Sequence, residues 1–442
     1  MSIFVLASWL CFGLTVVLML TIIYWERFQL VKPSIMMLVF YVVQIQFPST
    51  YMAARIETSI PNPWMYLTLA HLFPLAALLF GTFWLRGSAA VVFRRAVSTC
   101  SKRHNTNGTI LLLSLLSAAV VVYYLSEVPW GNTGLYAILF EPDSAVQARE
   151  DSLKLLESAL VRYSFAFFSS VLAPILAILL ASKLWHPKRM RSPGTLVASL
   201  LGIGLLLVGV SLYGARGPSA FLLLAIFYAL YLQKKFPFRP IRIIRITLII
   251  LTIPALLSLL HTRHQINAPD VTDSYVNMLD RVFGRNIDSH VWTVDFTQRY
   301  GFFGVGGIPK LAKLFGREPI DTFNVVGRAY RPNNPTISAN SSFVFGYYAC
   351  FGIIAFIPCL ILTWLLDLVL LLYRKVRPSL IVPCLGASAV AASKFTFTYY
   401  TTALASGGFL LIVALSLLLS IKLQSTVFPR RALSPALGNV SR

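Results

Sequence analysis

Arg216 is the residue of this chain whose position most suggests chemistry on an anion. It lies in the short turn Gly214-Ala-Arg-Gly-Pro218 between two apolar runs, so its guanidinium is expected at the mouth between two helices. A guanidinium can hold phosphate or carboxylate oxygens at two points. We interpret Arg216 as an anion clamp; the alternative is that it only extends toward lipid headgroups.

Further arginines lie in two polar segments, residues 127–161 and 261–341. The second segment holds seven arginines and two lysines, which favours an anionic ligand over a neutral one. The alternative is that these cations balance the seven acidic residues of the same segment as weak surface pairs. The candidate ligand-binding residues are Arg149, Arg263, Arg281, Arg285 and Arg328.

Lys394 lies inside an otherwise apolar run, between small residues and an aromatic stretch. An ionisable residue in such a run generally faces the bundle interior, because exposure to hydrocarbon costs about 3 kcal/mol. A functional and a structural role are both open for it. Asp367, in another apolar run, is interpreted as pairing locally or meeting water. The outer segments carry no metal-carboxylate motif and the five cysteines form no CxxC pair, so we expect no metal or other cofactor.

The elements that position these residues follow from composition. Of 442 residues, 57% are hydrophobic and 12% are charged. A soluble domain carries about 25% charged residues, so soluble enzymes, disordered proteins and disulfide scaffolds are excluded. The sequence predicts an all-α, polytopic membrane protein with about eleven spans, near residues 3–24, 33–53, 64–85, 109–126, 162–182, 194–213, 218–233, 243–260, 342–373, 379–398 and 405–421.

Basic residues separate the two faces of this predicted bundle. Alternate connections contain 23 of the 38 basic residues but only two of the 16 acidic ones. By the positive-inside rule this set is cytoplasmic, the N-terminus is outside and the C-terminus inside. We therefore interpret the net charge of +22 as a consequence of membrane topology, with basic residues contacting anionic lipid headgroups. No nucleic-acid partner is expected.

We expect one integral membrane helical domain, residues 1–422, followed by a disordered cytoplasmic tail, residues 423–442. Residues 127–161 and 261–341 are its large outer loops. A loop of about 80 residues is far longer than ordinary connections and indicates function. The chemistry should therefore face outward.

Several short motifs resemble the bacterial O-antigen polymerases, the Wzy family. They are the Gly-Ala-Arg-Gly-Pro turn, Met278-Leu-Asp-Arg-Val-Phe283, Asn333-Asn-Pro-Thr-Ile-Ser-Ala-Asn340, the Phe345-Gly-Tyr-Tyr and Phe351-Gly pairs, and Lys394 with Gly407-Gly408. The resemblance extends from about residue 147 to the last span. The Arg-x10-Gly spacing of that family's outer loops is absent from both large outer loops here.

The resemblance implies a GT-C-like membrane glycosyltransferase of the bacterial inner membrane. Such enzymes join oligosaccharide repeat units carried on undecaprenyl diphosphate, at the periplasmic face, and work with a chain-length-determining co-polymerase. On this hypothesis Arg216, Arg281, Arg285 and Lys394 stabilise the departing diphosphate without a metal. His264 or Asp280 is the base for the acceptor hydroxyl, and Asn340 and Arg328 orient sugar or phosphate.

Three other functions remain open from the sequence. An O-antigen ligase would share the topology and carrier but transfer polysaccharide to lipid A core. A flippase or transporter would predict internal repeats and polar residues deep in several spans. A scaffold would explain the topology but not Arg216 or Lys394. The product that accumulates in a null strain distinguishes a ligase from a polymerase. Polymer formation by purified protein without a gradient distinguishes a polymerase from a flippase or transporter.

Overall fold

The computed structural model describes residues 2–99, 106–141, 148, 151–152, 155–156, 158–184, 193–214, 216–232, 285–333, 339, 341–405 and 407–420. All regular elements within these ranges are helical. Eight helices or continuous helical stretches are long and apolar enough to cross a membrane. Pro33–Tyr51 and Ala53–Ser59 form a further candidate, bent by 73° at Met52. The chain is thus a polytopic, all-helical membrane protein.

These nine candidates match nine of the eleven predicted apolar runs in position. A tenth run coincides with the shorter apolar helix Phe221–Leu232, which lies within α14. The run at 243–260 and the expected tail lie outside the described residues. The helices of the spans are α1 (Ile3–Trp25), α2 (Pro33–Tyr41), α3 (Phe47–Tyr51), α5 (Pro63–Leu67), α6 (Phe73–Gly81), α8 (Asn107–Glu127), α11 (Ala159–Phe167), α12 (Ala173–Leu184), α13 (Pro193–Ser211), α14 (Arg216–Leu232), α20 (Phe343–Phe351), α21 (Phe356–Leu365), α22 (Val369–Tyr373), α23 (Pro378–Ser393), α24 (Tyr400–Ala405) and α25 (Phe409–Ser420).

Three spans contain a π-helical turn with a proline two residues after its last residue. The turns are η2 (Val42–Gln46), η3 (Thr68–Leu72) and η6 (Phe168–Leu172), and the prolines are Pro48, Pro74 and Pro174. Proline has no N–H to donate to the carbonyl four residues earlier, and its ring would clash with that carbonyl in a regular α-helix. A wider turn relieves the clash. Such turns recur at functional sites because they re-aim side chains.

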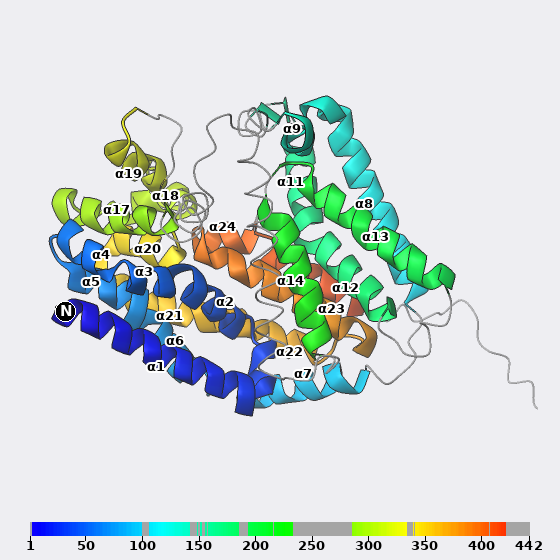
Figure 1. Ribbon diagram of the computed structural model, residues 1–442, viewed down its shortest axis with the longest axis horizontal. Helices are drawn as coiled ribbons and strands as arrows, with labels where there is room; N and C mark the ends of the chain where they lie inside the picture. The colour runs from blue at the N-terminus through cyan, green and yellow to red at the C-terminus, as the bar shows by residue number, and fades with distance from the viewer. Residues whose placement is uncertain are drawn as a thin grey trace, which may run out of the picture.

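The outer loops predicted from charge meet at one end of the bundle, hereafter the outer end. Ser2 donates to Glu57 (2.5 Å), and the amide of Asn62 donates to Gln298 (2.8 Å). The helices there are α4 (Ala53–Ser59), α9 (Gly134–Phe140), α17 (Arg285–Tyr300), α18 (Pro309–Leu314) and α19 (Thr322–Tyr330). Figure 1 shows α17, α18 and α19 grouped over α4, α5 and α20, while α9 lies beside α8 and α11.

The opposite, inner end is closed by buried charges at helix termini. Asp367 is fully buried and accepts hydrogen bonds from the amide (3.0 Å) and hydroxyl (2.7 Å) of Ser34 in the first turn of α2. Lys32 Nζ donates to the Gly81 carbonyl at the end of α6 (2.8 Å). An anion at a helix N-terminus and a cation at a C-terminus both oppose the helix dipole. The interpretation of Asp367 as locally paired or hydrated was therefore wrong.

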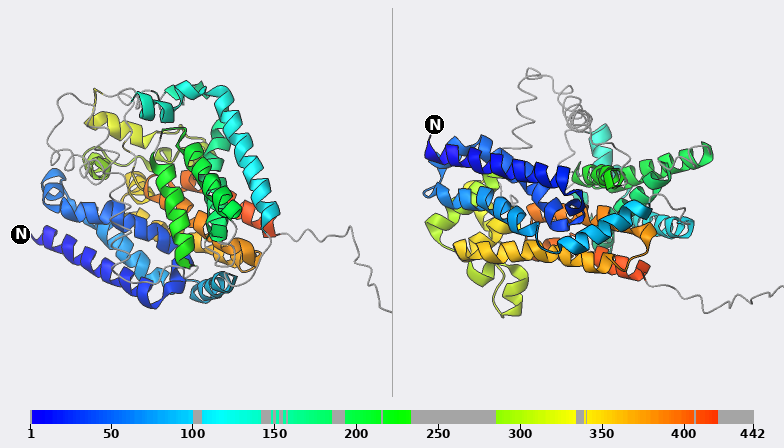
Figure 2. Two further views of the ribbon diagram at one scale, coloured as in Figure 1. Left: turned by 45° about the vertical axis from the view of Figure 1, so that its right-hand side comes forward. Right: turned by 90° about the horizontal axis from the view of Figure 1, so that it is seen from below.

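Helix α7 (Arg86–Thr99) lies at this inner end next to α22 (Figure 1). Arg95 donates to the carbonyls of Tyr373 (3.2 Å), Arg374 and Val376 (2.9 Å), which follow the last turn of α22. One arginine thus satisfies carbonyls that a helix end leaves without partners. In the view from below in Figure 2, α6 lies between α1 and α21, and it packs against both.

Candidate functional site

Lys394 lies at the outer end of α23, as the first residue of the 3-10 turn η11 (Lys394–Thr396). Its side chain is half-buried inside the bundle, and Nζ donates a hydrogen bond to Oγ of Ser170 on η6. Two residues on, Thr396 Oγ1 donates to Gln44 Oε1 on η2 (2.8 Å). We call Lys394, Thr396, Ser170 and Gln44 the Lys394 cluster. It joins the end of α23 to the π turns within two other spans.

The two π turns explain why polar partners are available at this depth. Ser170 and Gln44 each lie four residues before a proline, Pro174 and Pro48. The helix is therefore interrupted at the residues that contact Lys394 and Thr396. The π turns that accommodate the prolines also direct Ser170 and Gln44 toward the end of α23.

Gly407-Gly408, which the sequence associates with Lys394, also packs on η6. Gly408 has φ +94°, a conformation that favours glycine. A Cβ there would lie 2.9 Å from Val171 Cγ2 and 3.1 Å from Ser170 Cβ. Glycine thus lets the chain after α24 pass directly over Ser170. Lys394 and Gly408, the two parts of the sequence motif, therefore both contact Ser170.

Lys394 has no acidic partner among the residues that the structure describes. The ion pairs between described residues include Arg55–Asp288, Arg86–Glu26 and Arg299–Asp295, and none of these involves it. Serine is a neutral acceptor, so the ammonium charge is only partly solvated in its apolar surroundings. A cation placed in this way attracts an anion more strongly than one in water does.

Arg216 begins α14, and the structure places only its main chain. Helix α14 packs against α12 and α23, which supply Ser170's span and Lys394's helix (Figure 1). The preceding Gly214, at φ +78°, lies against Gly134 at the start of α9; a Cβ on Gly134 would be 2.5 Å from the Tyr213 carbonyl oxygen. Two glycines in contact therefore fix the turn before Arg216.

The other predicted site residues are distributed differently. Arg285 begins α17, with only its main chain placed, and Arg328 is exposed on α19. Helix α17 packs against α4, α5 and α20, and α19 packs against α17 and α20. Six predicted residues lie outside the described ranges: Arg149, Arg263, His264, Asp280, Arg281 and Asn340. Their roles stay predictions.

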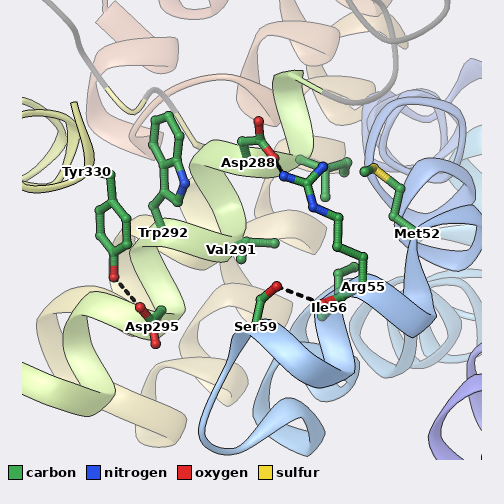
Figure 3. A pocket seen from close by; sticks show the side chains of 10 residues that line it. Met52, Arg55, Ile56, Ser59, Asp288, Val291, Trp292, Asp295 and Tyr330 are labelled. Carbon is green, nitrogen blue, oxygen red and sulfur yellow. Dashed lines mark hydrogen bonds and ion pairs between the residues drawn. The ribbon is translucent and has the colours of Figure 1, made fainter. Parts of the chain in front are cut away.

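A second polar site lies between α4, α17 and α19 at the outer end. It is a hollow of about 150 Å³, here called the α4–α17 hollow, whose ten lining residues are Met52, Arg55, Ile56, Ser59, Ile287, Asp288, Val291, Trp292, Asp295 and Tyr330. Figure 3 shows Trp292 and Tyr330 on one side and Arg55 with Met52 on the other. Arg55 and Asp288 form an ion pair of 3.4 Å across it.

The aromatic side of the hollow is held by stacking and by hydrogen bonds. The Trp292 and Tyr330 rings are 5.5 Å apart and nearly parallel, at 4°. The Arg331 guanidinium lies 5.2 Å from the Trp292 ring. Tyr330 donates its hydroxyl to Asp295, which also accepts from Arg299 Nε (2.7 Å). Burial and the Asp295 carboxylate raise the pKa of Tyr330, so this phenol remains a donor at neutral pH.

Sequence reasoning missed the residues of the hollow, and it missed Ser170 and Gln44. For the latter pair a local signal exists, since each stands four residues before a proline inside an apolar run. Asp288, Trp292 and Asp295 share the i, i+4, i+7 spacing of one helix face. That spacing becomes visible only when 285–300 is read as a helix.

Comparison with known protein families, with curated proteins and with solved structures found no match for this chain.

Proposed function

We propose that this protein is an O-antigen or surface-polysaccharide polymerase of a bacterial inner membrane. It joins oligosaccharide repeat units carried on undecaprenyl diphosphate, at the periplasmic face, by glycosyl transfer that needs no metal. The observation that carries the proposal is Lys394, a cation held inside a polytopic helical bundle with no described acidic partner. A lipid-borne diphosphate is an anion that reaches such a position from the membrane.

The proposed reaction forms a glycosidic bond and breaks the bond between the donor sugar and the diphosphate. The acceptor hydroxyl oxygen bonds to the anomeric carbon of the donor chain while that carbon's bond to the diphosphate oxygen breaks. The hydroxyl proton passes to a base, His264 or Asp280. Negative charge grows on the departing diphosphate, where Lys394 stabilises it together with Arg216, Arg281 and Arg285. The remaining predicted residues, Arg149, Arg263, Arg328 and Asn340, bind and orient the substrate.

The order of elements supports this division of roles. Arg216 begins a helix that packs against α23, and Lys394 follows the end of α23 at the same outer end of the bundle. Tyr399, five residues after Lys394, stacks on Phe323 of α19 at 4.4 Å. The outer helices therefore lie directly above the segment that carries the proposed diphosphate ligand, where a sugar chain would continue from the carrier.

Reconstitution tests the proposal. Purified protein in liposomes would receive one defined undecaprenyl-diphosphate-linked repeat unit, with no ion gradient. We expect a ladder of carrier-linked polymers, and a chain-length-determining co-polymerase should narrow its length distribution. Failure of the wild type to form any ladder overturns the proposal. Transfer to added lipid A core instead indicates a ligase, and movement of the carrier across the bilayer without new glycosidic bonds indicates a flippase.

A further inference from the structure

The α4–α17 hollow lies apart from the Lys394 cluster and has a different electrostatic character. Its lining carries two carboxylates, Asp288 and Asp295, against one guanidinium, that of Arg55. Both carboxylates are already paired with cations, Asp288 with Arg55 and Asp295 with Arg299. The lining therefore presents no net positive charge to attract a phosphate or diphosphate. The hollow suits a neutral or weakly polar ligand better than the carrier's anion.

Hydrogen-bonding groups of the lining match a ligand that offers several hydroxyls. Ionised carboxylates only accept hydrogen bonds, and a guanidinium only donates them, so together they pair with groups that do both. The indole nitrogen of Trp292 lies on the side of the hollow in Figure 3, and no described residue accepts its N–H. The Arg55 side chain is 62% exposed, which leaves donors available beyond its contact with Asp288.

The shape of the hollow limits the ligand to one ring-sized group. Its volume of about 150 Å³ is small, whereas complete ligand pockets measure about 300–1,000 Å³. The stacked Trp292 and Tyr330 rings form a rigid wall, with apolar Val291 and Ile56 beside them. A rigid aromatic wall next to carboxylates offers apolar contact to C–H groups and hydrogen bonds to hydroxyls at the same time.

We propose that the α4–α17 hollow binds one sugar ring of the carrier-linked oligosaccharide, with Asp288 and Asp295 accepting from its hydroxyls and Arg55 and Trp292 donating to them. The assignment rests on the proposed function for the identity of the ligand. Helix α17 also packs against η2, whose Gln44 binds Thr396 of the Lys394 cluster. The hollow is thus a neutral-sugar subsite joined through one element to the proposed diphosphate site.

Binding of free sugar chains tests this assignment apart from catalysis. The probe is oligosaccharide of one to three repeat units, prepared by partial acid hydrolysis of the host strain's own surface polysaccharide and measured by saturation-transfer NMR on detergent-purified protein. Trp292→Ala and Asp288→Asn should each weaken binding by about tenfold, the effect of one lost hydrogen bond to a charged group or one aromatic contact. Trp130→Ala and Glu318→Gln, at exposed positions of the outer loops, should bind as the wild type does.

Each outcome decides the assignment. Wild-type affinity in both hollow variants overturns it, as does competition by inorganic diphosphate, because the charges of the lining are already paired. If Trp292→Ala fails to fold, Arg55→Gln replaces it, because this side chain is mostly exposed. If the hollow variants form ladders and bind the sugar with unchanged affinity, the polymerase proposal is supported and the sugar subsite is overturned. If the wild type binds the sugar but makes no ladder, and the hollow variants lose sugar binding, the sugar subsite is supported and the polymerase proposal is not.

Discussion

Replacing Lys394 by methionine removes the ammonium charge and keeps a long unbranched side chain. In the proposed reaction the diphosphate lies next to Nζ. At about 4 Å and an effective dielectric constant of about 20, suited to a half-buried pair, one charge pair contributes about 4 kcal/mol. If that attraction grows as the leaving group takes up charge, its loss slows glycosyl transfer by about 10³-fold. Lys394→Arg, which retains the charge, should restore part of the rate.

Polymer formation in proteoliposomes under single-turnover conditions measures this effect, with thermal unfolding in detergent recorded beside it. The Lys394→Met protein should unfold at the wild-type temperature or above, because a partly desolvated cation has been removed. Lys310→Met is the matched control: Lys310 is exposed at the outer end and donates to the Thr401 carbonyl (3.2 Å), so its loss should leave the rate unchanged. A folded Lys394→Met protein that polymerises at the wild-type rate would refute the reasoning.

Three further predictions concern stability. Asp367→Ala should lower the free energy of unfolding by about 3 kcal/mol, because a buried carboxylate that accepts two hydrogen bonds from Ser34 is lost; thermal unfolding in detergent measures it, and an unchanged midpoint contradicts it. The raised pKa of Tyr330 stabilises the fold fully below its ordinary value of 10.0 and is lost as the pH rises through the raised pKa. Unfolding midpoints should therefore fall more steeply above about pH 10 in the wild type than in Tyr330→Phe, and parallel curves would count against this. Gly134→Ala should lower the midpoint, since its Cβ would meet backbone 2.5 Å away, whereas Gly131→Ala, with no atom within 4 Å, should not; equal midpoints would remove the glycine contact from the account.

Hydropathy and charge predicted the general architecture because both are summed over many residues. A run of about 20 apolar residues has few ways to satisfy its backbone in lipid other than a helix. The alternation of basic loops sorted the predicted connections into two groups, and the orientation that this implies stays a prediction. The bend of 73° at Met52 was not predicted, since composition records polarity but not direction. Residues 285–300 were expected as loop because a 16-residue amphipathic helix resembles a polar loop in average hydropathy.

The candidate site was only partly predictable for a related reason. A lysine inside an apolar run is conspicuous, so Lys394 could be selected from the sequence. Ser170, which accepts from Lys394, and Gln44, which accepts from Thr396, are common residue types, and these contacts join positions 224 and 352 residues apart in the chain. Such pairings are decided by how whole spans pack. The α4–α17 hollow arises in the same way, from α4, which follows the second candidate span, and α17, which follows residues 233–284 that lie outside the described ranges.

The π turn in the span α11–η6–α12 has a consequence for how sequence length is tolerated. One residue corresponds to about 100° of rotation around a helix axis, so the extra residue of a π turn offsets the facing of everything on one side of it against the other. Deleting one residue of this turn other than Ser170 would remove the wider turn that accommodates Pro174. It would also rotate the outer half of that span by the same angle and turn the hydroxyl of Ser170 away from Lys394. Surface loops tolerate such deletions, whereas the number of residues in this span is constrained by the contact between Ser170 and Lys394.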